Sequence, residues 1–323
     1  MRIVVLDGYT LNPGDNPWDA LTRFGELTVY ERTQEKEIAA RARPADIILT
    51  NKTPLTADTL ARLPKLRFIS VLATGYNVVD AAAAGARGIP VSNVPEYGTA
   101  SVAQHVFALL LELCHHVGLH DAAVKAGEWT GTPDFCFWKV SPVELAGLTM
   151  GIVGFGRIGR RVGDLARAFG MTVVAAGRAR PEVAGDAPVT MTDVADVFAR
   201  ADAVSLHCPL TPSNARFVNH DLLSRMKPSA FFINTARGGL VDEAALAEAL
   251  NAGRLAGAAL DVVSVEPMQW ENPLRGARNC VITPHMAWGS LAARRRLMAV
   301  TVENVAAFLS GHPINVVNSD GLI

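Results

Sequence analysis

The sequence has few cysteines, no long hydrophobic run and no cysteine pair at metal-binding spacing. Its four cysteines lie far apart without a CxxC motif, which fits neither a disulfide framework nor a zinc site. The longest strongly apolar stretch, residues 106–114, is far shorter than the ~20 residues that span a bilayer, and it contains Glu112. These absences favour a protein of the reducing cytoplasm.

An excess of charge of either sign is also missing. The chain has 30 Lys and Arg against 31 Asp and Glu, a formal net charge of −1. Nucleic acids and anionic membranes attract basic proteins, so we expect neither as a partner. We also expect no signal peptide, because residues 1–6 run directly into Asp7 and Gly8.

What the chain does have is length and apolar content. Half of its 323 residues are hydrophobic and 19% are charged, which predicts a sizeable core and, at this length, two domains. Short apolar runs alternate with helical patterns, which indicates two doubly wound α/β domains with parallel sheets. The runs expected to be strands are 3–6, 47–49, 68–72, 89–91, 150–153, 172–176, 203–206, 230–233, 258–260 and 281–283.

Two long helical patterns interrupt this alternation. Residues 99–117 are apolar on nearly every side, which predicts a helix buried all round, within the protomer or between subunits. Residues 291–310 are amphipathic and no further strand of the second series follows. We interpret this helix as a return to the first domain. The expected domains are therefore 1–98 with 288–323, and 99–287, with hinges near Pro95 and Met286.

A glycine motif opens the second series of strands. In Gly154-Phe-Gly156-Arg157-Ile158-Gly159, a strand pattern precedes the first glycine and a helical pattern, 157–169, follows. The glycines allow a tight turn, the approach of a pyrophosphate and close packing of helix on strand. The helix N-terminus then offers free N–H groups to the phosphates. In this context the motif predicts a dinucleotide site.

The end of the next strand indicates which dinucleotide is bound. NAD sites usually place Asp or Glu there to bind the ribose 2′-hydroxyl, but this position is Gly177, followed by Arg178 and Arg180. A glycine leaves room for a 2′-phosphate, and arginine pairs with it through charge-assisted hydrogen bonds. A solvated basic loop is the alternative. The missing acid favours NADP, with NADPH preferred over NADH.

Three further segments follow apolar runs, and each carries residues suited to reducing a 2-oxo acid. They are Asn234-Thr-Ala-Arg237-Gly-Gly-Leu-Val-Asp242, Asp261-Val-Val-Ser-Val-Glu266-Pro267 and Thr283-Pro-His285-Met-Ala-Trp288. Together with the glycine motif, the 71–77 loop and the 93–98 hinge, they resemble the D-isomer-specific 2-hydroxyacid dehydrogenase family. Within this family, the chain particularly resembles glycerate dehydrogenases and hydroxypyruvate/glyoxylate reductases. The resemblance implies a Rossmann cofactor domain inserted into a flavodoxin-like substrate domain.

By this resemblance, Arg237 binds the substrate carboxylate and polarises the carbonyl. His285 is the acid/base that protonates the carbonyl oxygen, and Glu266 orients the imidazole and favours its charged form. A guanidinium suits a carboxylate, and histidine most readily cycles a proton near neutrality. Each residue also has a structural alternative: Arg237 as an ion-pair partner of Asp242, Glu266 as a turn residue and His285 as a buried polar cap.

Other positions follow from the resemblance or from sequence proximity. We expect Thr74 and Gly75 to bind the substrate carboxylate and Asp261 to accept from the nicotinamide carboxamide. The remaining candidates are cofactor-cleft residues and pocket walls: Cys208, Pro209, Thr235 and Ala236 for the cofactor, and Trp288 and Trp138 for the substrate. Core packing is the alternative for Cys208, and interface packing for both tryptophans. We expect His115, His116 and His120 to form a wet helix end, and no metal site.

These observations predict a cytoplasmic, NADPH-dependent reductase that converts glyoxylate or hydroxypyruvate to a D-2-hydroxy acid. We expect a homodimer built on the 99–117 helix, with the aromatic-rich 129–138 loop reaching the neighbour. One alternative is a nucleotide-sensing binding protein, like the corepressors that share this fold, and another is a dehydrogenase of bulkier 2-oxo acids. The absence of visible extensions disfavours a corepressor and a phosphoglycerate dehydrogenase.

Overall fold

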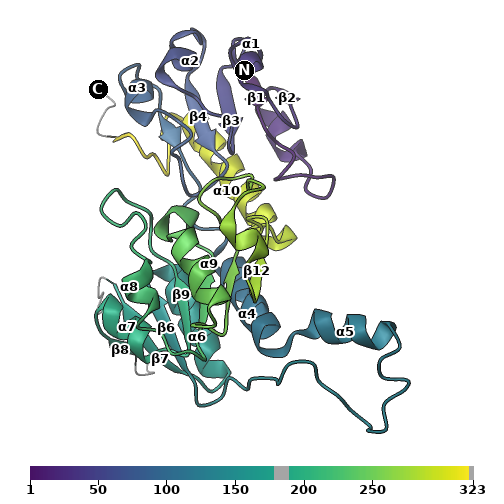
Figure 1. Ribbon diagram of the computed structural model, residues 1–323. Helices are drawn as coiled ribbons and strands as arrows, with labels where there is room; N and C mark the ends of the chain where they lie inside the picture. Colours follow the sequence, from purple (N-terminus) through teal and green to yellow (C-terminus); the bar gives the residue numbers. More distant parts are fainter. Residues whose placement is uncertain (178–188, 320–323) are drawn as a thin grey trace. The chain divides into compact units, whose positions relative to one another are not determined.

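The computed structural model describes residues 1–177 and 189–319 and divides into two compact units. Unit 1 comprises Met1–Gly98 and Trp288–Ile323, and unit 2 comprises Thr99–Ala287 (Figure 1). The chain thus crosses between the units twice. Each unit has its own parallel sheet, so the predicted fold class is confirmed.

Unit 1 is built on a five-stranded parallel sheet of order β2-β1-β3-β4-β5, the flavodoxin-like order 2-1-3-4-5. Its strands are β1 (Arg2–Val5), β2 (Glu26–Val29), β3 (Ile47–Thr50), β4 (Phe68–Val71) and β5 (Val91–Ser92). Its helices are α1 (Ile38–Ala42), α2 (Ala57–Ala61), α3 (Ala81–Gly85) and α10 (Leu291–Leu309), with the 3-10 turns η1 (Asp19–Phe24) and η2 (Glu35–Glu37).

The sheet of unit 1 is buried on both faces. Successive residues of a strand point to opposite sides, so Val4 packs into one hydrophobic cluster while Ile3 and Val5 pack into another. The second cluster includes Leu297 and Val305 of α10. The C-terminal helix therefore completes the core of the N-terminal sheet.

Unit 2 contains a seven-stranded parallel sheet of order β12-β11-β10-β9-β6-β7-β8. In the unit's own chain order this is 7-6-5-4-1-2-3, the Rossmann arrangement with one added strand. The strands are β6 (Thr149–Val153), β7 (Thr172–Ala176), β8 (Thr190–Met191), β9 (Ala203–Leu206), β10 (Phe231–Asn234), β11 (Gly257–Leu260) and β12 (Cys280–Ile282). The helices are α4 (Thr99–His115), α5 (Val117–Lys125), α6 (Arg157–Ala168), α7 (Val194–Arg200), α8 (His220–Leu223) and α9 (Glu243–Asn251), with η4 (Gly238–Leu240) and η5 (Pro273–Gly276).

Helix α4 packs against α6 and is a core helix of unit 2. Eight of its residues are buried, but Gln104 and Ala108 are exposed, so the expectation of burial all round is wrong within the protomer. The helix also ends at His115, two residues earlier than expected. His116 adopts a left-handed conformation (φ 46°), and α5 continues after a bend of 53°.

No single described helix is long and apolar enough to cross a membrane. Among the described helices, α4 and α5 together are long and apolar enough, but they are bent by 53°, and α4 is largely buried in the core of unit 2.

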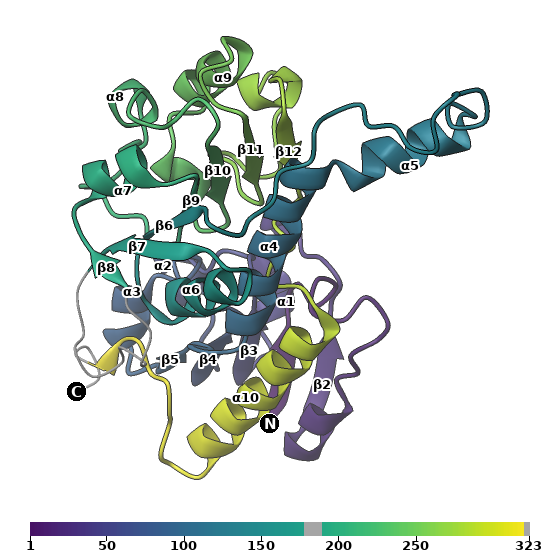
Figure 2. The same cartoon turned by 90° about the horizontal axis from the view of Figure 1, so that it is seen from below.

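Helix α5 and the irregular segment after it project from the rest of unit 2 (Figures 1 and 2). We call residues 117–140 the arm. Seven large hydrophobic side chains on it are exposed, and Phe135 is the most exposed at 89%: Val117, Leu119, Val124, Trp129, Phe135, Trp138 and Val140. Such a concentration of exposed apolar side chains is typical of interaction surfaces.

Every strand expected from an apolar run is present, with bounds that differ by at most two residues. Two strands were not predicted, β2 and β8, and each lies at an edge of its sheet. Their side chains are partly or fully exposed, so neither strand forms a buried apolar run. Thr56 caps α2 by accepting a hydrogen bond from the Thr59 N–H at 3.2 Å.

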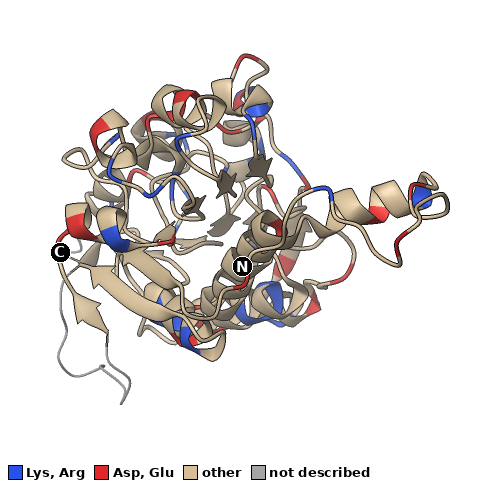
Figure 3. Ribbon diagram, turned by 60° about the horizontal axis from the view of Figure 1, so that its bottom comes forward, with Lys and Arg blue, Asp and Glu red and all other residues tan. Residues whose placement is uncertain are grey.

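Charged residues lie mainly on helices and loops, where basic and acidic residues are interspersed (Figure 3).

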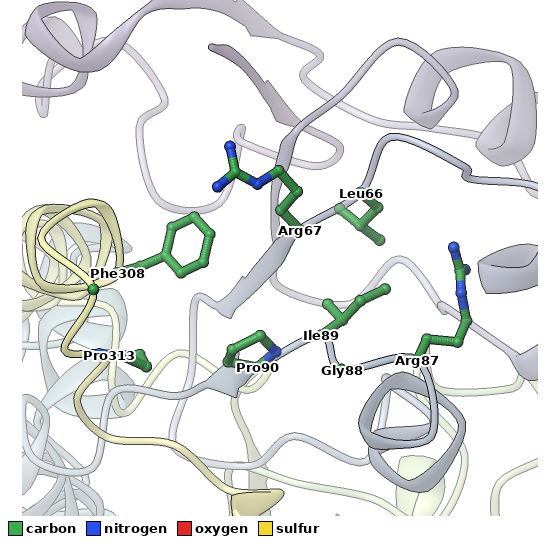
Figure 4. Close-up of a pocket in the computed structure, with 9 residues that line it drawn as sticks. Leu66, Arg67, Arg87, Gly88, Ile89, Pro90, Phe308 and Pro313 are labelled. Atoms are coloured by element: carbon green, nitrogen blue, oxygen red, sulfur yellow. The ribbon is translucent and has the colours of Figure 1, made fainter. Parts of the chain in front are cut away.

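A cavity of about 420 Å³ lies in unit 1 between the amino ends of β4 and β5 and the end of α10 (Figure 4). The Arg87 guanidinium in its wall donates hydrogen bonds to the Leu60 and Leu63 carbonyl oxygens. The guanidinium carbon of Arg67 lies 5.8 Å from the centre of the Phe308 ring. This cavity is at the opposite end of the sheet from the predicted substrate loop.

Candidate active site

The predicted cofactor and catalytic residues of unit 2 gather at one edge of its sheet. Because all seven strands are parallel, the residues that follow them lie at the same carboxyl edge, where open α/β sheets bind ligands. The order along the edge is Thr283 and His285 after β12, Asp261 after β11, Thr235 to Arg237 after β10, Cys208 and Pro209 after β9, Gly154 after β6 and Gly177 after β7.

The glycine motif forms a tight turn beside β9, at the point where the strand order reverses. Gly154 has φ +98°, and a Cβ there would lie 2.5 Å from the Cys208 nitrogen. A Cβ on Gly159 would lie 2.3 Å from the Gly154 carbonyl oxygen, whereas one on Gly156 meets nothing within 4 Å. Gly154 and Gly159 are therefore required for packing. Gly156 leaves open space at the N-terminus of α6, where Arg157 and Ile158 begin the helix.

Gly177 approaches the same turn from β7. Its φ of +150° would strain any other residue, and a Cβ would lie 3.0 Å from the Phe155 nitrogen. An acidic side chain at this position would thus be strained as well as repelling a 2′-phosphate. Arg178 and Arg180 lie outside the described residues.

The groups beside the turn on β9 are uncharged near neutral pH. Burial lowers the pKa of His207 to about 3, and its Nε2 lies 2.9 Å from Ser205 Oγ. Burial also raises the pKa of the Cys208 thiol. His207 therefore adds no positive charge at the turn, whereas the helix N-terminus presents its N–H groups there.

The end of β10 supplies a polar atom without a protein partner. Within residues 1–177 and 189–319, Thr235 Oγ1 is one of three buried side-chain polar atoms that form no hydrogen bond. The N–H of the next residue, Ala236, donates a hydrogen bond to Asn234 Oδ1 at 3.0 Å. A buried hydroxyl normally finds a partner, so Thr235 fits the edge of a ligand site. The open space at Gly156, the helix N-terminus and this hydroxyl together fit a dinucleotide.

His285 and Glu266 form a close pair. His285 Nδ1 lies 2.6 Å from Glu266 Oε2, and both side chains are about one third exposed. The other carboxylate oxygen, Oε1, accepts the Val263 N–H at 3.3 Å. Since Nδ1 faces the carboxylate, Nε2 is the ring nitrogen available to a substrate.

Arg237 lies in the exposed turn after β10. Its Nη1 donates to the Ala236 carbonyl oxygen at 2.7 Å. Asp242 caps α9 by accepting the Ala245 N–H at 3.1 Å, and no ion pair joins it to Arg237 in the described structure. The structural alternative for Arg237, pairing with Asp242, is therefore wrong.

Asp261 is 1% exposed, and its carboxylate is surrounded by protein donors. It accepts the Met286 and Ala287 N–H groups at 2.9 and 2.8 Å and the Thr283 hydroxyl at 2.6 Å. Burial raises the pKa of Asp261, but hydrogen bonds from His105, Thr283 and the backbone hold it below its ordinary value. Its contact with a nicotinamide carboxamide stays a prediction.

Sequence reasoning missed two supports of the catalytic segments. Glu243 holds the loop that carries Glu266, because its carboxylate accepts from the Ser264 N–H and hydroxyl and from Asn272 Nδ2, at 2.6 to 2.8 Å. His105 of α4 contacts Thr283 and Asp261. The sequence feature that could have pointed to His105 is a histidine in the middle of an otherwise apolar helix.

The predicted substrate loop of unit 1 follows β4. Thr74 Oγ1 donates to the Val94 carbonyl oxygen at 2.8 Å, and Asn93 Nδ2 donates to the Thr74 carbonyl oxygen at 2.7 Å. The side-chain amide of the buried Asn304, in α10, donates to the Asn93 carbonyl oxygen at 2.9 Å. These contacts fix the conformation of the loop. Binding of the substrate carboxylate by Thr74 and Gly75 stays a prediction.

The two predicted pocket tryptophans occupy different surroundings. Trp288 packs edge-on against Tyr97 in unit 1, with ring centres 6.2 Å apart. Trp138 lies on the arm and is 61% exposed.

No group of three His, Cys, Asp or Glu side chains in the described parts of the chain could hold a metal ion. His120 joins α5 to the end of the arm, since its Nε2 accepts the Lys139 N–H at 3.0 Å.

Comparison with known proteins assigns the family. Residues 107–287 match the model of the "D-isomer specific 2-hydroxyacid dehydrogenase, NAD binding domain". The hydroxypyruvate reductase of Blautia hydrogenotrophica is 47% identical over 98% of this chain and 100% of its own length. The chain belongs to the D-isomer specific 2-hydroxyacid dehydrogenase family.

Other members of this family extend the comparison. The glycerate dehydrogenase of Methylorubrum extorquens is 40% identical over 98% of this chain and 99% of its own. The structure of an NADPH-dependent glyoxylate/hydroxypyruvate reductase from Sinorhizobium meliloti, in complex with NADP and malonate, superposes with a TM-score of 0.81. It is 30% identical and covers 98% of this chain and 96% of that one. This protein is accordingly an oxidoreductase of 2-hydroxy acids with a nicotinamide dinucleotide cofactor.

The glycines of the motif should respond differently to the same substitution. Gly156→Ala should fold normally, because the added methyl group meets open space, but should raise the Kd for the nucleotide at least about tenfold by blocking the pyrophosphate. Gly159→Ala should lower the free energy of unfolding by about 1–3 kcal/mol or more, because its methyl group overlaps the Gly154 carbonyl.

Thermal unfolding and a fluorescence titration of NADPH measure the two effects. An unstable Gly156→Ala variant, or one that binds nucleotide like the wild type, would contradict this assignment.

Proposed function

We propose that this enzyme uses NADPH to reduce small 2-oxo acids, glyoxylate or hydroxypyruvate, to D-2-hydroxy acids, with His285 as the acid/base. The observation that carries the proposal is the pair of His285 and Glu266, 2.6 Å apart, at the sheet edge that also holds the glycine turn. Turnover assays with both substrates and both nucleotides test it. Nucleotide binding without turnover would favour a sensing protein instead.

The proton comes from His285. When bound, reduced nicotinamide supplies the hydride that the substrate carbonyl carbon accepts. Glu266 accepts a hydrogen bond from the Nδ1–H, which fixes the ring orientation and stabilises the imidazolium, so that Nε2 donates its proton to the developing alkoxide. The ring is left neutral with its remaining proton on Nδ1, facing the carboxylate.

Arg237 and the loop after β4 bind the substrate. The Arg237 guanidinium is exposed at the carboxyl edge of the sheet, and its planar set of donors suits a carboxylate. The backbone N–H groups of Thr74 and Gly75 provide further donors for the carboxylate. Unit 1 is therefore the proposed substrate domain, and unit 2 carries the nucleotide.

The preference for NADPH rests on Gly177 and the arginines after it. Gly177 removes the acid that would repel a 2′-phosphate, and Arg178 and Arg180 would pair with that phosphate. The solved reductase from Sinorhizobium meliloti, which was crystallised with NADP, is a relative with this cofactor. The proposed compartment is the cytoplasm, since all four cysteines are free.

The enzyme should be a homodimer assembled through α4 and the arm. Burying the exposed apolar side chains of the arm on a second copy would stabilise the dimer, because apolar area contributes about 25 cal/mol per Å². Light scattering at micromolar concentration should give twice the monomer mass. A stable monomer would contradict the prediction.

Charge substitutions test the same surface. Phe135→Asp should shift the equilibrium toward the monomer, since it places a carboxylate in the exposed apolar surface that the proposed dimer would bury. Trp270→Asp is the matched control, because Trp270 is 73% exposed but lies outside the arm. We expect it to leave the mass unchanged.

Substrate size should depend on the tryptophans. Trp288 lies three residues after His285, and Trp138 is on the arm that we expect to reach the neighbouring subunit. If they wall the pocket, glyoxylate and hydroxypyruvate should react better than phenylpyruvate. Trp288→Ala should shift kcat/KM toward the bulkier acid by ~1–3 kcal/mol, a graded preference. A wild-type enzyme that favours phenylpyruvate would show that the pocket is open.

A further inference from the structure

The backbone of His285 has an unfavourable conformation. Its φ is +53°, in the left-handed region that residues with a Cβ rarely adopt. Such a conformation persists only where the surrounding structure holds it. The groups that hold it therefore decide where the imidazole lies.

A single residue, Asp261, holds three consecutive backbone N–H groups of this segment. Its carbonyl oxygen accepts the His285 N–H at 2.8 Å, and its carboxylate oxygens accept those of Met286 and Ala287. The carboxylate is buried, so its own orientation depends on protein donors. Two side chains provide that orientation.

The first of these is Thr283 and the second is His105. Thr283 Oγ1 donates its only proton to Asp261 Oδ1 at 2.6 Å, so it can only accept from His105 Nε2, 3.0 Å away. His105 Nε2 also lies 3.5 Å from Asp261 Oδ1. The hydrogen bonds thus run from an imidazole of α4 through a hydroxyl to the carboxylate.

Helix α4 contacts the same segment a second time. Ser101 Oγ donates to the Ala287 carbonyl oxygen at 2.7 Å. Ser101 and His105 are four residues apart, so they lie on one face of the helix. That face therefore holds the segment of His285 at two points, both within unit 2.

We propose that Thr283 and His105 are positioning residues of the reaction, which hold the His285 imidazole in place through the carboxylate of Asp261. The inference rests on the proposed role of His285 as acid/base. It assigns to α4 a catalytic support in addition to its place in the core. Loss of either donor loosens the 285–287 backbone and misplaces the imidazole without altering its chemistry.

The test compares variants that remove and restore the donors. Thr283→Val, which is nearly isosteric, should lower kcat with glyoxylate and NADPH by about 10–100-fold, while the Kd for NADPH changes less than about twofold. Thr283→Ser should restore most of kcat because it restores the hydroxyl. His105→Leu should lower kcat in the same way, and His105→Gln, which keeps an N–H donor, should retain more activity.

Hydrogen exchange gives a readout independent of activity. The amides of residues 285–287 should exchange faster in Thr283→Val and His105→Leu than in the wild type, with little change elsewhere. Thr172→Val is the matched control, because its hydroxyl pairs with Thr149 at the opposite end of the sheet. Thermal unfolding identifies a variant that has merely lost stability. If one of the two donor-removing variants is unstable, the variant at the other donor tests the proposal.

Unchanged kcat and unchanged exchange in both donor-removing variants would overturn the proposal, as would a loss of kcat that serine does not rescue. Failure of the proposed function is distinguishable. In that case His285→Ala would retain full activity, while the exchange of residues 285–287 would still show whether Thr283 and His105 hold the segment.

Discussion

His285→Ala should lower kcat by about 10²–10⁴-fold, the range that a positioned proton donor contributes. The Kd for NADPH should change less than about twofold, because the imidazole acts on the carbonyl oxygen and does not bind the nucleotide. Glu266→Gln should give a smaller loss, since a neutral amide still accepts a hydrogen bond from Nδ1 but no longer stabilises the imidazolium. Stopped-flow turnover and a fluorescence titration measure the two quantities.

Arg237→Ala provides the contrast within the same site. It should raise KM for the 2-oxo acid as well as lower kcat, since the guanidinium acts on both the bound carboxylate and the developing alkoxide. Arg237→Lys should recover little, because an ammonium lacks the planar pair of donors. Wild-type activity in either the His285 or the Arg237 variant would mean that the residue is structural.

The enzyme should prefer NADPH over NADH by roughly tenfold to a thousandfold in kcat/KM. Each charge-assisted contact of an arginine with the 2′-phosphate is worth ~1.5–3 kcal/mol, reduced by exposure, and each ~1.4 kcal/mol is tenfold. Arg178→Ala and Arg180→Ala should erode the preference mainly through KM for NADPH. The kinetics with NADH should change little, because NADH lacks the phosphate.

Arg200→Ala is the matched control for this experiment. Arg200 is a surface arginine of the same unit, paired with Asp196 at 3.0 Å at the end of α7. Its loss should leave the nucleotide preference unchanged. An enzyme that treats the two nucleotides alike, or that prefers NADH, refutes the assignment to the 2′-phosphate.

The sequence predicted the features that depend on local order along the chain. Apolar runs of three to five residues located the buried strands, and the glycine motif located the turn between β6 and α6. The sequence also placed Arg237, Glu266 and His285 after strands, and parallel strands bring such residues to one edge. It failed where exposure removes the apolar signal, at β2 and β8, and where one residue, His116, leaves the helical conformation.

By itself, then, the sequence determined the fold class and which residues reach the carboxyl edge, because strand period, glycine spacing and chain order are local properties. Only the tertiary structure decided the partners of those residues. It joined Glu266 to His285, placed Asp261 against the backbone of residues 286 and 287, and brought His105 to Thr283 from 178 positions away. Contacts between residues so far apart depend on how helices pack on the sheet, which no spacing along the chain expresses.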